Sequence, residues 1–234
     1  VQTHPVYYVA SELGEHSPNP FRGIDYSRFD PEAALRHLRL FAVRDIVALS
    51  PTLTAALQAR TDVAQVAHVP PYSVFRLQGP PPRYVEPLAF APVRSPRAEW
   101  RRKALRWFSR KPPSEAHLVF TDDLRFTTVE PDEWLSPPEL PLASGVEVTE
   151  TVEPEEVRIR VSRVGHPLLV KVSYHPRWKV EGASGPYLAS PALMVVVPHS
   201  PEVRLYYATN WADSGGRLLT GLALVVLAGG TWLR

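Results

Sequence analysis

The stretch that decides the fold is residues 165–233, GHPLLVKVSYHPRWKVEGASGPYLASPALMVVVPHSPEVRLYYATNWADSGGRLLTGLALVVLAGGTWL. Its first part is rich in the aromatic and β-branched residues that favour strands. Residues 218–233 carry no charge and lie between Arg217 and Arg234. As a helix this run reaches roughly 24 Å, short of a roughly 30 Å hydrocarbon core. We interpret residues 216–234 as the start of a transmembrane helix, truncated here; the alternative is a buried C-terminal helix.

Short apolar runs upstream of this stretch predict a mainly β domain over residues 81–215. The alternation of Val157, Ile159 and Val161 with arginines is typical of a half-buried antiparallel strand. Gly182, Gly185 and Pro186 indicate a turn. The regular spacing of short strands predicts an antiparallel β-sandwich-like domain. The expected strands are 84–93, 117–121, 125–129, 146–152, 157–164, 168–174, 178–180, 192–197 and 203–207.

Residues 1–80 have a different pattern, in which strands and helices alternate. Asp30-Pro31 and Ser50-Pro51 each combine an N-cap residue with a proline at the first helical position, so they predict two helix starts. The expected strands are 6–10, 43–49, 64–69 and 72–77. We therefore expect a small α/β unit before the β domain, which makes the chain α+β overall.

A basic segment is inserted into the β domain at about residues 97–110. Residues 94–111 hold eight of the 26 basic residues and one acid, so the rest of the chain has more acidic than basic residues. Apolar residues at i, i+4, i+7 and i+8 from Trp100 define one face of a helix. This face can pack on the domain with a solvated basic side outward, or the helix can bind lipid headgroups or a lipid-linked phosphate. The residues for the second role are Trp100, Arg101, Arg102, Arg106, Trp107 and Arg110.

Evidence for catalysis within the chain is weak. The eight histidines include no i, i+4 pair, and the chain has no cysteine. Asp122-Asp123 and Glu155-Glu156 are adjacent carboxylates; neighbours on a strand point to opposite faces, so neither indicates an acid/base pair, and both are expected at the solvated surface. These observations disfavour a secreted hydrolase. They predict no metal site and no cofactor, and leave any catalytic residue unidentified. Nucleic acid is not an expected partner, because no binding motif accompanies the basic segment.

The C-terminal stretch resembles a known bacterial family. The resemblance covers about 60 residues and is carried by Ser173-Tyr174-x-Pro176-x-Trp178-Lys179, Gly182-Ala183-x-Gly185-Pro186-Tyr187 and Pro191-x-Leu193-Met194-x-Val196-x-Pro198. These segments are similar to the C-terminal extracytoplasmic portion of multi-pass membrane proteins described as 6-pyruvoyl-tetrahydropterin-synthase-related. That family looks like the C-superfamily glycosyltransferases, which use polyprenyl-phosphate sugars. The pterin chemistry is not carried over, since it requires a histidine zinc site that this chain lacks.

The resemblance implies an extracytoplasmic domain on a cell membrane. Its parent protein would transfer a sugar from a lipid-phosphate donor to a cell-envelope glycan, and the family's catalytic acid would precede Val1. The alternative is a membrane-anchored module that binds carbohydrate or acts as an envelope scaffold without catalysis. Expected partners are membrane lipid or a lipid-linked sugar and an envelope glycan. The substrate-binding candidates are Tyr174, Arg177, Trp178, Lys179 and Tyr187.

Trp178 has two possible roles with different consequences. As a sugar platform it would be exposed, whereas between two sheets it would be buried. Val170, Val172 and Val180 supply apolar neighbours on adjoining strand segments. We therefore expect Trp178 to be a core residue.

Overall fold

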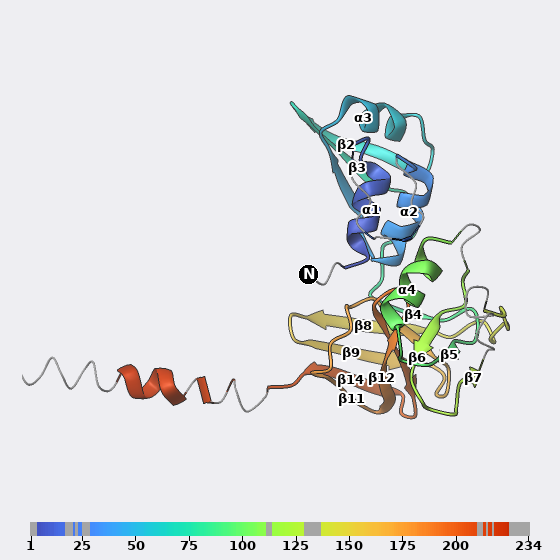
Figure 1. Ribbon diagram of the computed structural model, residues 1–234, viewed down its shortest axis with the longest axis vertical. Helices are drawn as coiled ribbons and strands as arrows, with labels where there is room; N and C mark the ends of the chain where they lie inside the picture. The colour runs from blue at the N-terminus through green and yellow to red at the C-terminus, as the bar shows by residue number, and fades with distance from the viewer. Residues whose placement is uncertain are drawn as a thin grey trace, which may run out of the picture.

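The structure is a computed structural model that describes residues 4–16, 21, 23–24, 29–110, 114–128, 137–209, 213, 215–216 and 218–224. Within these residues the chain is a mixed α+β protein with three sheets (Figure 1). A small unit of helices and one sheet lies at the top of the view, and two larger sheets lie below it. The α+β class expected from the sequence is confirmed.

The small unit packs helices on one face of a three-stranded antiparallel sheet with strand order β1-β3-β2. Its strands are β1 (Asp45–Ala48), β2 (Val63–Val69) and β3 (Tyr72–Leu77), and its helices are α1 (Val6–Leu13), α2 (Pro31–Leu40) and α3 (Pro51–Gln58). Both expected caps are confirmed. The Asp30 carboxylate accepts from the Ala33 N–H at 3.0 Å, and the Ser50 hydroxyl accepts from the Leu53 N–H at 3.3 Å.

One expected strand in this unit is wrong. Residues 6–10 belong to helix α1. The β-branched and aromatic residues of this segment favour a strand, but Tyr8, Val9 and Glu12 are all buried. These positions share one helical face, so packing against α2 decides the local structure over intrinsic propensity.

The larger part of the chain forms two sheets. The seven-stranded sheet has the order β4-β10-β13-β12-β6-β5-β7, and the four-stranded sheet has the order β11-β14-β9-β8. β5 pairs in parallel with both β6 and β7, so the expectation of a wholly antiparallel domain is wrong at this edge. The bounds are β4 (Val85–Pro87), β5 (Val93–Ser95), β6 (Leu118–Phe120), β7 (Thr127–Thr128), β8 (Val148–Glu153), β9 (Glu156–Val161), β10 (Leu168–Val170), β11 (Trp178–Glu181), β12 (Ala183–Ala189), β13 (Leu193–Pro198) and β14 (Glu202–Tyr207).

A single hydrophobic cluster joins the two larger sheets. It combines buried residues of the seven-stranded sheet, such as Val170 and Met194, with residues of the four-stranded sheet, such as Ile159, Trp178 and Leu205. Alternation along β9 buries its apolar side chains and exposes Arg158 and Arg160, as the sequence predicts. The packing of the two sheets is sandwich-like.

β12 was not expected as a strand. Gly185 and Pro186, read from the sequence as part of a turn, lie inside it, and its pairing with β13 shifts register between Ser184 and Tyr187. A bulge of this kind accommodates glycine and proline within a sheet. The turn itself lies at Gly182, between β11 and β12, with a φ of 77°.

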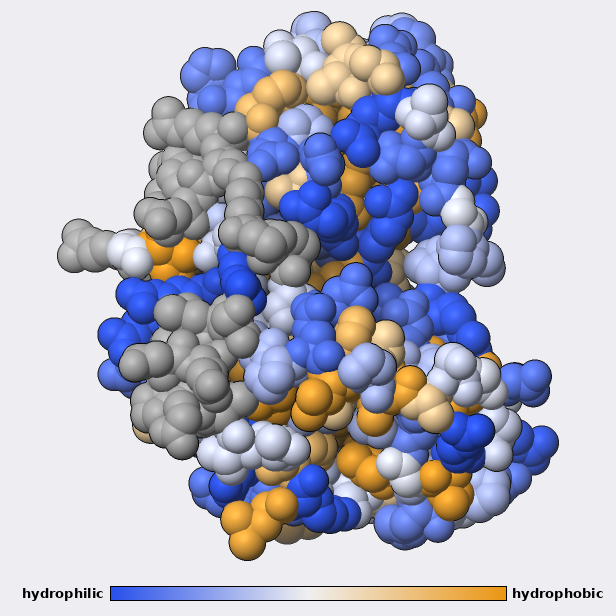
Figure 2. All heavy atoms as spheres, turned by 90° about the vertical axis from the view of Figure 1, so that its right-hand side faces the viewer, coloured by the Kyte–Doolittle hydropathy of each residue, from blue (hydrophilic) through white to orange (hydrophobic). Residues whose placement is uncertain are grey.

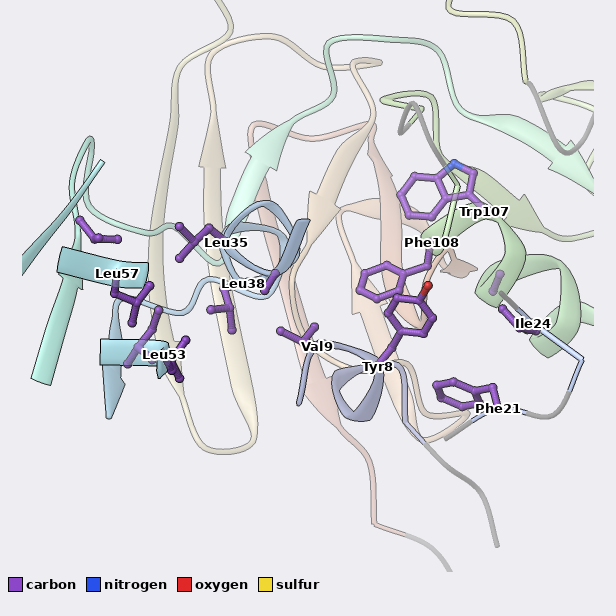
Figure 3. Close-up of a cluster of buried hydrophobic side chains, with 14 of the residues drawn as sticks. Tyr8, Val9, Phe21, Ile24, Leu35, Leu38, Leu53, Leu57, Trp107 and Phe108 are labelled. Atoms are coloured by element: carbon purple, nitrogen blue, oxygen red, sulfur yellow. The ribbon is translucent and has the colours of Figure 1, made fainter. Parts of the chain in front are cut away.

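A second cluster joins the small unit to the seven-stranded sheet through helix α4 (Trp100–Phe108). Phe108 of α4 lies with its ring centroid 5.7 Å from that of Tyr8 in α1, in an edge-on arrangement (Figure 3). The same cluster includes Leu118 of β6 and Leu188 of β12. Helix α4 is therefore covered on its apolar side by both parts of the chain.

The surface to the right of Figure 1 is hollowed where the small unit meets the sheets (Figure 2). Cavities of about 280 and 470 Å³ lie between α2, β4 and the residues around Glu115. Their charged groups include pairs already formed: the Lys171 ammonium lies 2.7 Å from Glu86, and an Arg39 nitrogen lies 3.4 Å from Asp62.

The C-terminal segment is helical at residues 213, 215–216 and 218–224 and extends away from the sheets (Figure 1). Leu218, Leu219, Leu222 and Leu224 are exposed. Among the described residues no helix has the length and apolar character needed to cross a bilayer. Arg217 and residues 225–234 of the expected span lie outside the described residues.

Candidate functional site

A cavity of about 420 Å³ brings together four segments of the chain. They are the N-terminal segment before α1, the start of α4, the loop that follows β10, and the end of β12 with the turn after it. We call this cavity the Arg97–Tyr174 pocket. The residues that give it chemical character are His4, Arg97, Trp100, Arg101, Tyr174 and His175.

Local backbone contacts place the walls of the pocket. Glu99 adopts a φ of 55° immediately before α4, and the Trp100 N–H donates to the Arg97 carbonyl at 3.2 Å. This tight turn holds Arg97 beside the first turn of the helix. On the opposite wall the Tyr174 N–H donates to the Ala192 carbonyl at 2.8 Å, which ties the β10–β11 loop to the β12–β13 turn.

Two arginines in the pocket have aromatic neighbours and, over the part of the chain that the structure describes, no acidic partner. A terminal nitrogen of Arg97 donates to the Tyr174 hydroxyl at 3.5 Å, and its guanidinium carbon lies 5.8 Å from the centre of that ring. The Arg101 guanidinium lies 5.0 Å from the centre of the Trp100 ring. Among the described residues neither arginine forms an ion pair with a carboxylate. Both positive charges therefore remain available to an anion.

The neighbouring Arg102 differs in this respect. Its guanidinium forms an ion pair with Glu99 within the first turn of the helix. Arg102 and Arg106 are exposed, as are Arg97 and Arg101, but neither of them lines the pocket. Arg102 has an acidic partner before any ligand arrives, whereas Arg97 and Arg101 have none among the described residues.

His4 completes the pocket from the N-terminal side. Its Nδ1 accepts a hydrogen bond from the Val6 N–H at 3.2 Å, so Nε2 carries the proton and donates to the Ser173 hydroxyl at 3.1 Å. Burial lowers the pKa of the His4 imidazole, which favours this neutral form. The Phe41 ring packs at 5.7 Å from the imidazole.

The pocket lies close to the point where the chain leaves the sheets. The Tyr207 hydroxyl at the end of β14 lies 3.0 Å from Nδ1 of His175. Arg177 donates through Nε to the Ala208 carbonyl at 2.8 Å and forms an ion pair with Asp213. These bonds tie the pocket loop to the segment that leads into the C-terminal helix.

The expected site residues separate into two groups. Trp100, Arg101 and Tyr174 line the pocket, and Arg177 lies on the same loop, where it is paired with Asp213. Trp178 is only 8% exposed and packs edge-on against Tyr207 at 5.5 Å between ring centres. The expectation that Trp178 is a core residue is confirmed, so it is not available as a sugar platform.

Lys179 and Tyr187 lie elsewhere. Lys179 is exposed on the outer face of the four-stranded sheet, because successive residues of β11 point to opposite sides. The Tyr187 hydroxyl donates to Asp123 at 2.6 Å, and burial together with this bond raises the pKa of Tyr187 to about 12. Arg125, paired with Asp123, holds the pKa of that carboxyl well below its usual range. This network satisfies its own members, and Tyr187 does not line the Arg97–Tyr174 pocket.

The apolar side of the basic helix α4 packs on the rest of the protein, which is the first of the two alternatives given by the sequence. Trp107 and Phe108 are buried, and the Trp107 indole N–H donates to the Ala116 carbonyl at 2.9 Å. Trp107 and Phe108 are therefore not available to lipid, whereas Trp100 on the same side is partly exposed. Arg110 follows the helix and is half-buried. Trp100 and Arg101 face the pocket, which leaves the first turn of α4 as the chemically available part.

Four polar or charged pocket residues were missed by the sequence reasoning, namely His4, Arg97, Ser173 and His175. Arg97 belongs to the basic stretch, but helical periodicity begins at Trp100 and does not include it. Ser173 is part of the family-like motif without a separate role, and His4 is a lone histidine with no sequence neighbours of similar chemistry. Only Arg97 carried a local signal, the density of basic residues around it.

The pocket is suited to binding. The described residues that line it supply arginine, histidine, hydroxyl and aromatic groups, and none of them carries a carboxylate. Over the part of the chain that the structure describes, no three His, Cys, Asp or Glu side chains are placed to hold a metal ion. The arrangement can attract an anion and stack a ring, and it contains no acid and base pair of carboxylates.

Comparison with protein-family models, with curated proteins and with solved structures finds no match to this chain.

Proposed function

We propose that this chain is the extracytoplasmic part of a polytopic, glycosyltransferase-like membrane protein and that it assists sugar transfer from a lipid-phosphate donor to a cell-envelope acceptor. Its part in the reaction is to hold the phosphate-bearing ligand in the Arg97–Tyr174 pocket. The observation that carries this proposal is the presence in one cavity of two arginines, Arg97 and Arg101, that have no acidic partner among the described residues and lie beside two aromatic rings.

The chemistry of these groups supports a phosphorylated sugar as the ligand. Guanidinium groups form short, charge-assisted and often bidentate hydrogen bonds with phosphate oxygens. Trp100 and Tyr174 offer flat, partly exposed faces of the kind that can pack against a sugar ring. The volume of the cavity falls within the usual range for small-molecule sites.

The position of the pocket supports a ligand anchored in the membrane. The loop that carries Tyr174 is bonded to the residues from which the chain proceeds to its apolar C-terminal run. Exposed leucines at the start of this run would be covered if the run enters a bilayer, as part of a transmembrane helix over residues 216–234. A pocket near that entry point lies within reach of a headgroup at the membrane surface.

The alternative function, a carbohydrate-binding or scaffolding module without catalysis, is supported by one observation. The described lining of the pocket has no carboxylate to act as a general acid or base. In the transferase proposal that group comes from another part of the parent protein. The two functions also differ in the ligand they require: the transferase function needs a ligand that carries phosphate, and the module does not.

The proposed function is tested by titrating farnesyl phosphate and farnesol into the full chain held in a non-ionic detergent. We expect the phosphate to bind and farnesol to bind at least tenfold more weakly. An Arg97→Gln/Arg101→Gln variant should lose at least tenfold in affinity for the phosphate. The matched control is Arg102→Gln/Arg106→Gln, which removes the same charge from the exposed side of α4.

Equal losses in the two double variants would contradict the proposal, because they would show a general effect of net charge. Binding of a neutral oligosaccharide that depends on Arg97 and Arg101 as strongly as the phosphate does would favour the non-catalytic module.

A further inference from the structure

His4 holds one proton, and its hydrogen bonds show where that proton lies. The Val6 N–H can only donate, so Nδ1 of His4 is the acceptor and bears no hydrogen. The Nε2–H then donates to the Ser173 hydroxyl. A second proton would have to occupy Nδ1, where the Val6 N–H now points, so protonation requires the imidazole to leave this arrangement.

The surroundings of His4 oppose a second positive charge while the pocket is empty. Arg97 and Arg101 on the α4 side are cationic and lack acidic partners among the described residues. From the loop after β10 the pocket receives His175 and the neutral Tyr174, and the segment after α2 contributes only the apolar Phe41. None of the described lining residues is an acid that could stabilise an imidazolium. Burial acts in the same direction and lowers the pKa of His4.

A dianion in the pocket reverses this balance. It supplies a negative charge beside the imidazole in the same pocket and gives an imidazolium an acceptor for its new Nδ1–H. We propose that the Arg97–Tyr174 pocket is a proton-coupled site for a phosphate-type dianion, in which ligand binding is accompanied by protonation of His4. The segment that carries His4 then changes its hydrogen bonding as the ligand enters. This rests on the proposed function in one point, namely that the ligand of the pocket carries such an anion.

The sign of the coupling follows from linkage. A group that is neutral in the free protein and protonated in the complex takes up a proton on binding, so affinity rises as pH falls. If the bound anion raises the pKa of His4 by about one unit, affinity rises by roughly threefold to sevenfold between pH 8 and pH 5.5, and it approaches tenfold only below the pKa of the free protein. A phosphate ester also titrates near pH 6, so it would confuse the measurement.

The test therefore uses inorganic sulfate, whose charge is constant over this range, with the full chain in non-ionic detergent at fixed ionic strength. Calorimetry in two buffers with different heats of ionisation reports the protons taken up. We expect sulfate affinity to rise roughly threefold to sevenfold from pH 8 to pH 5.5, with proton uptake. The variant His4→Gln should bind with one affinity throughout, close to that of the wild type at pH 8. His199→Gln, at an exposed histidine outside the pocket, is the matched control and should behave as wild type.

A measurement on the wild type keeps the test independent of how the variant folds. The ring signals of His4 in an NMR titration should report the Nε2–H tautomer at neutral pH and a pKa that rises when sulfate is added. A pKa of His4 that does not move, or the same pH dependence in His4→Gln, overturns the coupling. Sulfate affinity that is independent of pH overturns it while leaving the pocket intact. Absence of sulfate binding at every pH also overturns the coupling. The proposed function is overturned separately, if farnesyl phosphate binds the Arg97→Gln/Arg101→Gln variant as tightly as the wild type.

Discussion

At the scale of single residues, Trp178 and Lys179 show how a strand separates neighbours. Both belong to the family-like motif, but Trp178 points into the cluster between the sheets and Lys179 points to solvent. A site that includes both would need side chains on opposite sides of one sheet. Being adjacent in the motif therefore does not place these two residues in one site. Arg97 and Tyr174 are far apart in the sequence, yet both line the same pocket.

The burial of Trp178 leads to a prediction about stability. Trp178→Ala should lower the free energy of unfolding by about 3–5 kcal/mol, because it leaves a cavity between the two sheets. Chemical denaturation of the wild type and the variant measures this difference. A denaturation midpoint equal to that of the wild type would contradict the core role.

His117 is a buried residue with a consequence for pH dependence. Its Nδ1 donates to the Ser190 carbonyl at 2.8 Å, and its ring lies 4.8 Å from that of Trp107. Burial lowers the pKa of His117 to about 4. Above the unfolded pKa of about 6.5 both states are neutral at this position, so the group has no effect on stability there.

As pH falls below about 6.5 the unfolded chain binds a proton at His117, whereas the folded chain does not bind it until the pH approaches 4. Stability should therefore decrease between pH 6.5 and pH 4, by about 3 kcal/mol from this group. His117→Asn retains a donor and does not titrate, so its unfolding free energy should depend less on pH over that window. Parallel curves for the two proteins would show that the proton is taken up elsewhere.

At the scale of elements, α4 has two faces with different surroundings. The sequence pattern of the helix predicts an apolar face and a basic face, and both are present. Most of the apolar face is buried between the small unit and the seven-stranded sheet, which removes Trp107 from any lipid contact. The part of the helix that remains accessible to a ligand is its first turn, together with Arg97 just before it.

The turn between β11 and β12 depends on a glycine. A Cβ at Gly182 would lie 2.2 Å from the Glu202 carbonyl oxygen, and the φ of 77° is one that L-residues rarely adopt. Gly182→Ala should destabilise the protein by about 2–4 kcal/mol, through backbone strain and crowding together. Thermal and chemical denaturation both measure this loss.

Gly165 provides the matched control for this prediction. It has a similar φ of 80°, but no atom lies within 4 Å of a Cβ added there. Gly165→Ala should therefore cost only the conformational part, about 1–2 kcal/mol. Equal losses at the two positions would show that contact with the Glu202 carbonyl contributes nothing.

At the scale of the whole molecule, the cluster around Phe108 makes the small unit and the sheets one packed body. It includes residues of α1, α2, α3, α4, β6 and β12, so neither part buries the apolar face of α4 alone. Residues 1–80 and 81–215 differ in their sequence patterns, but their interiors are connected through this helix.

This shared interior predicts cooperative unfolding. Tryptophan fluorescence and far-UV circular dichroism should follow a single denaturation transition, and Phe108→Ala should lower its midpoint for both probes, at a cost of about 3–5 kcal/mol. Two separated transitions in the wild type would contradict the shared interior.

The sequence by itself determined the α+β class, the caps of α2 and α3, most of the strands and the burial of Trp178, because these depend on local chemistry and on the alternation of side chains along one element. It did not determine α1, the parallel pairs of β5, or β12, where tertiary packing overrides propensities or accommodates glycine and proline in a bulge. Residue chemistry was enough to select Trp100, Arg101 and Tyr174 as candidates. It could not predict that they share a pocket with Arg97 and His4. Only the tertiary structure decided the pocket, since its walls come from segments about 70 to 170 residues apart, and no periodicity in the sequence reports a contact over that distance.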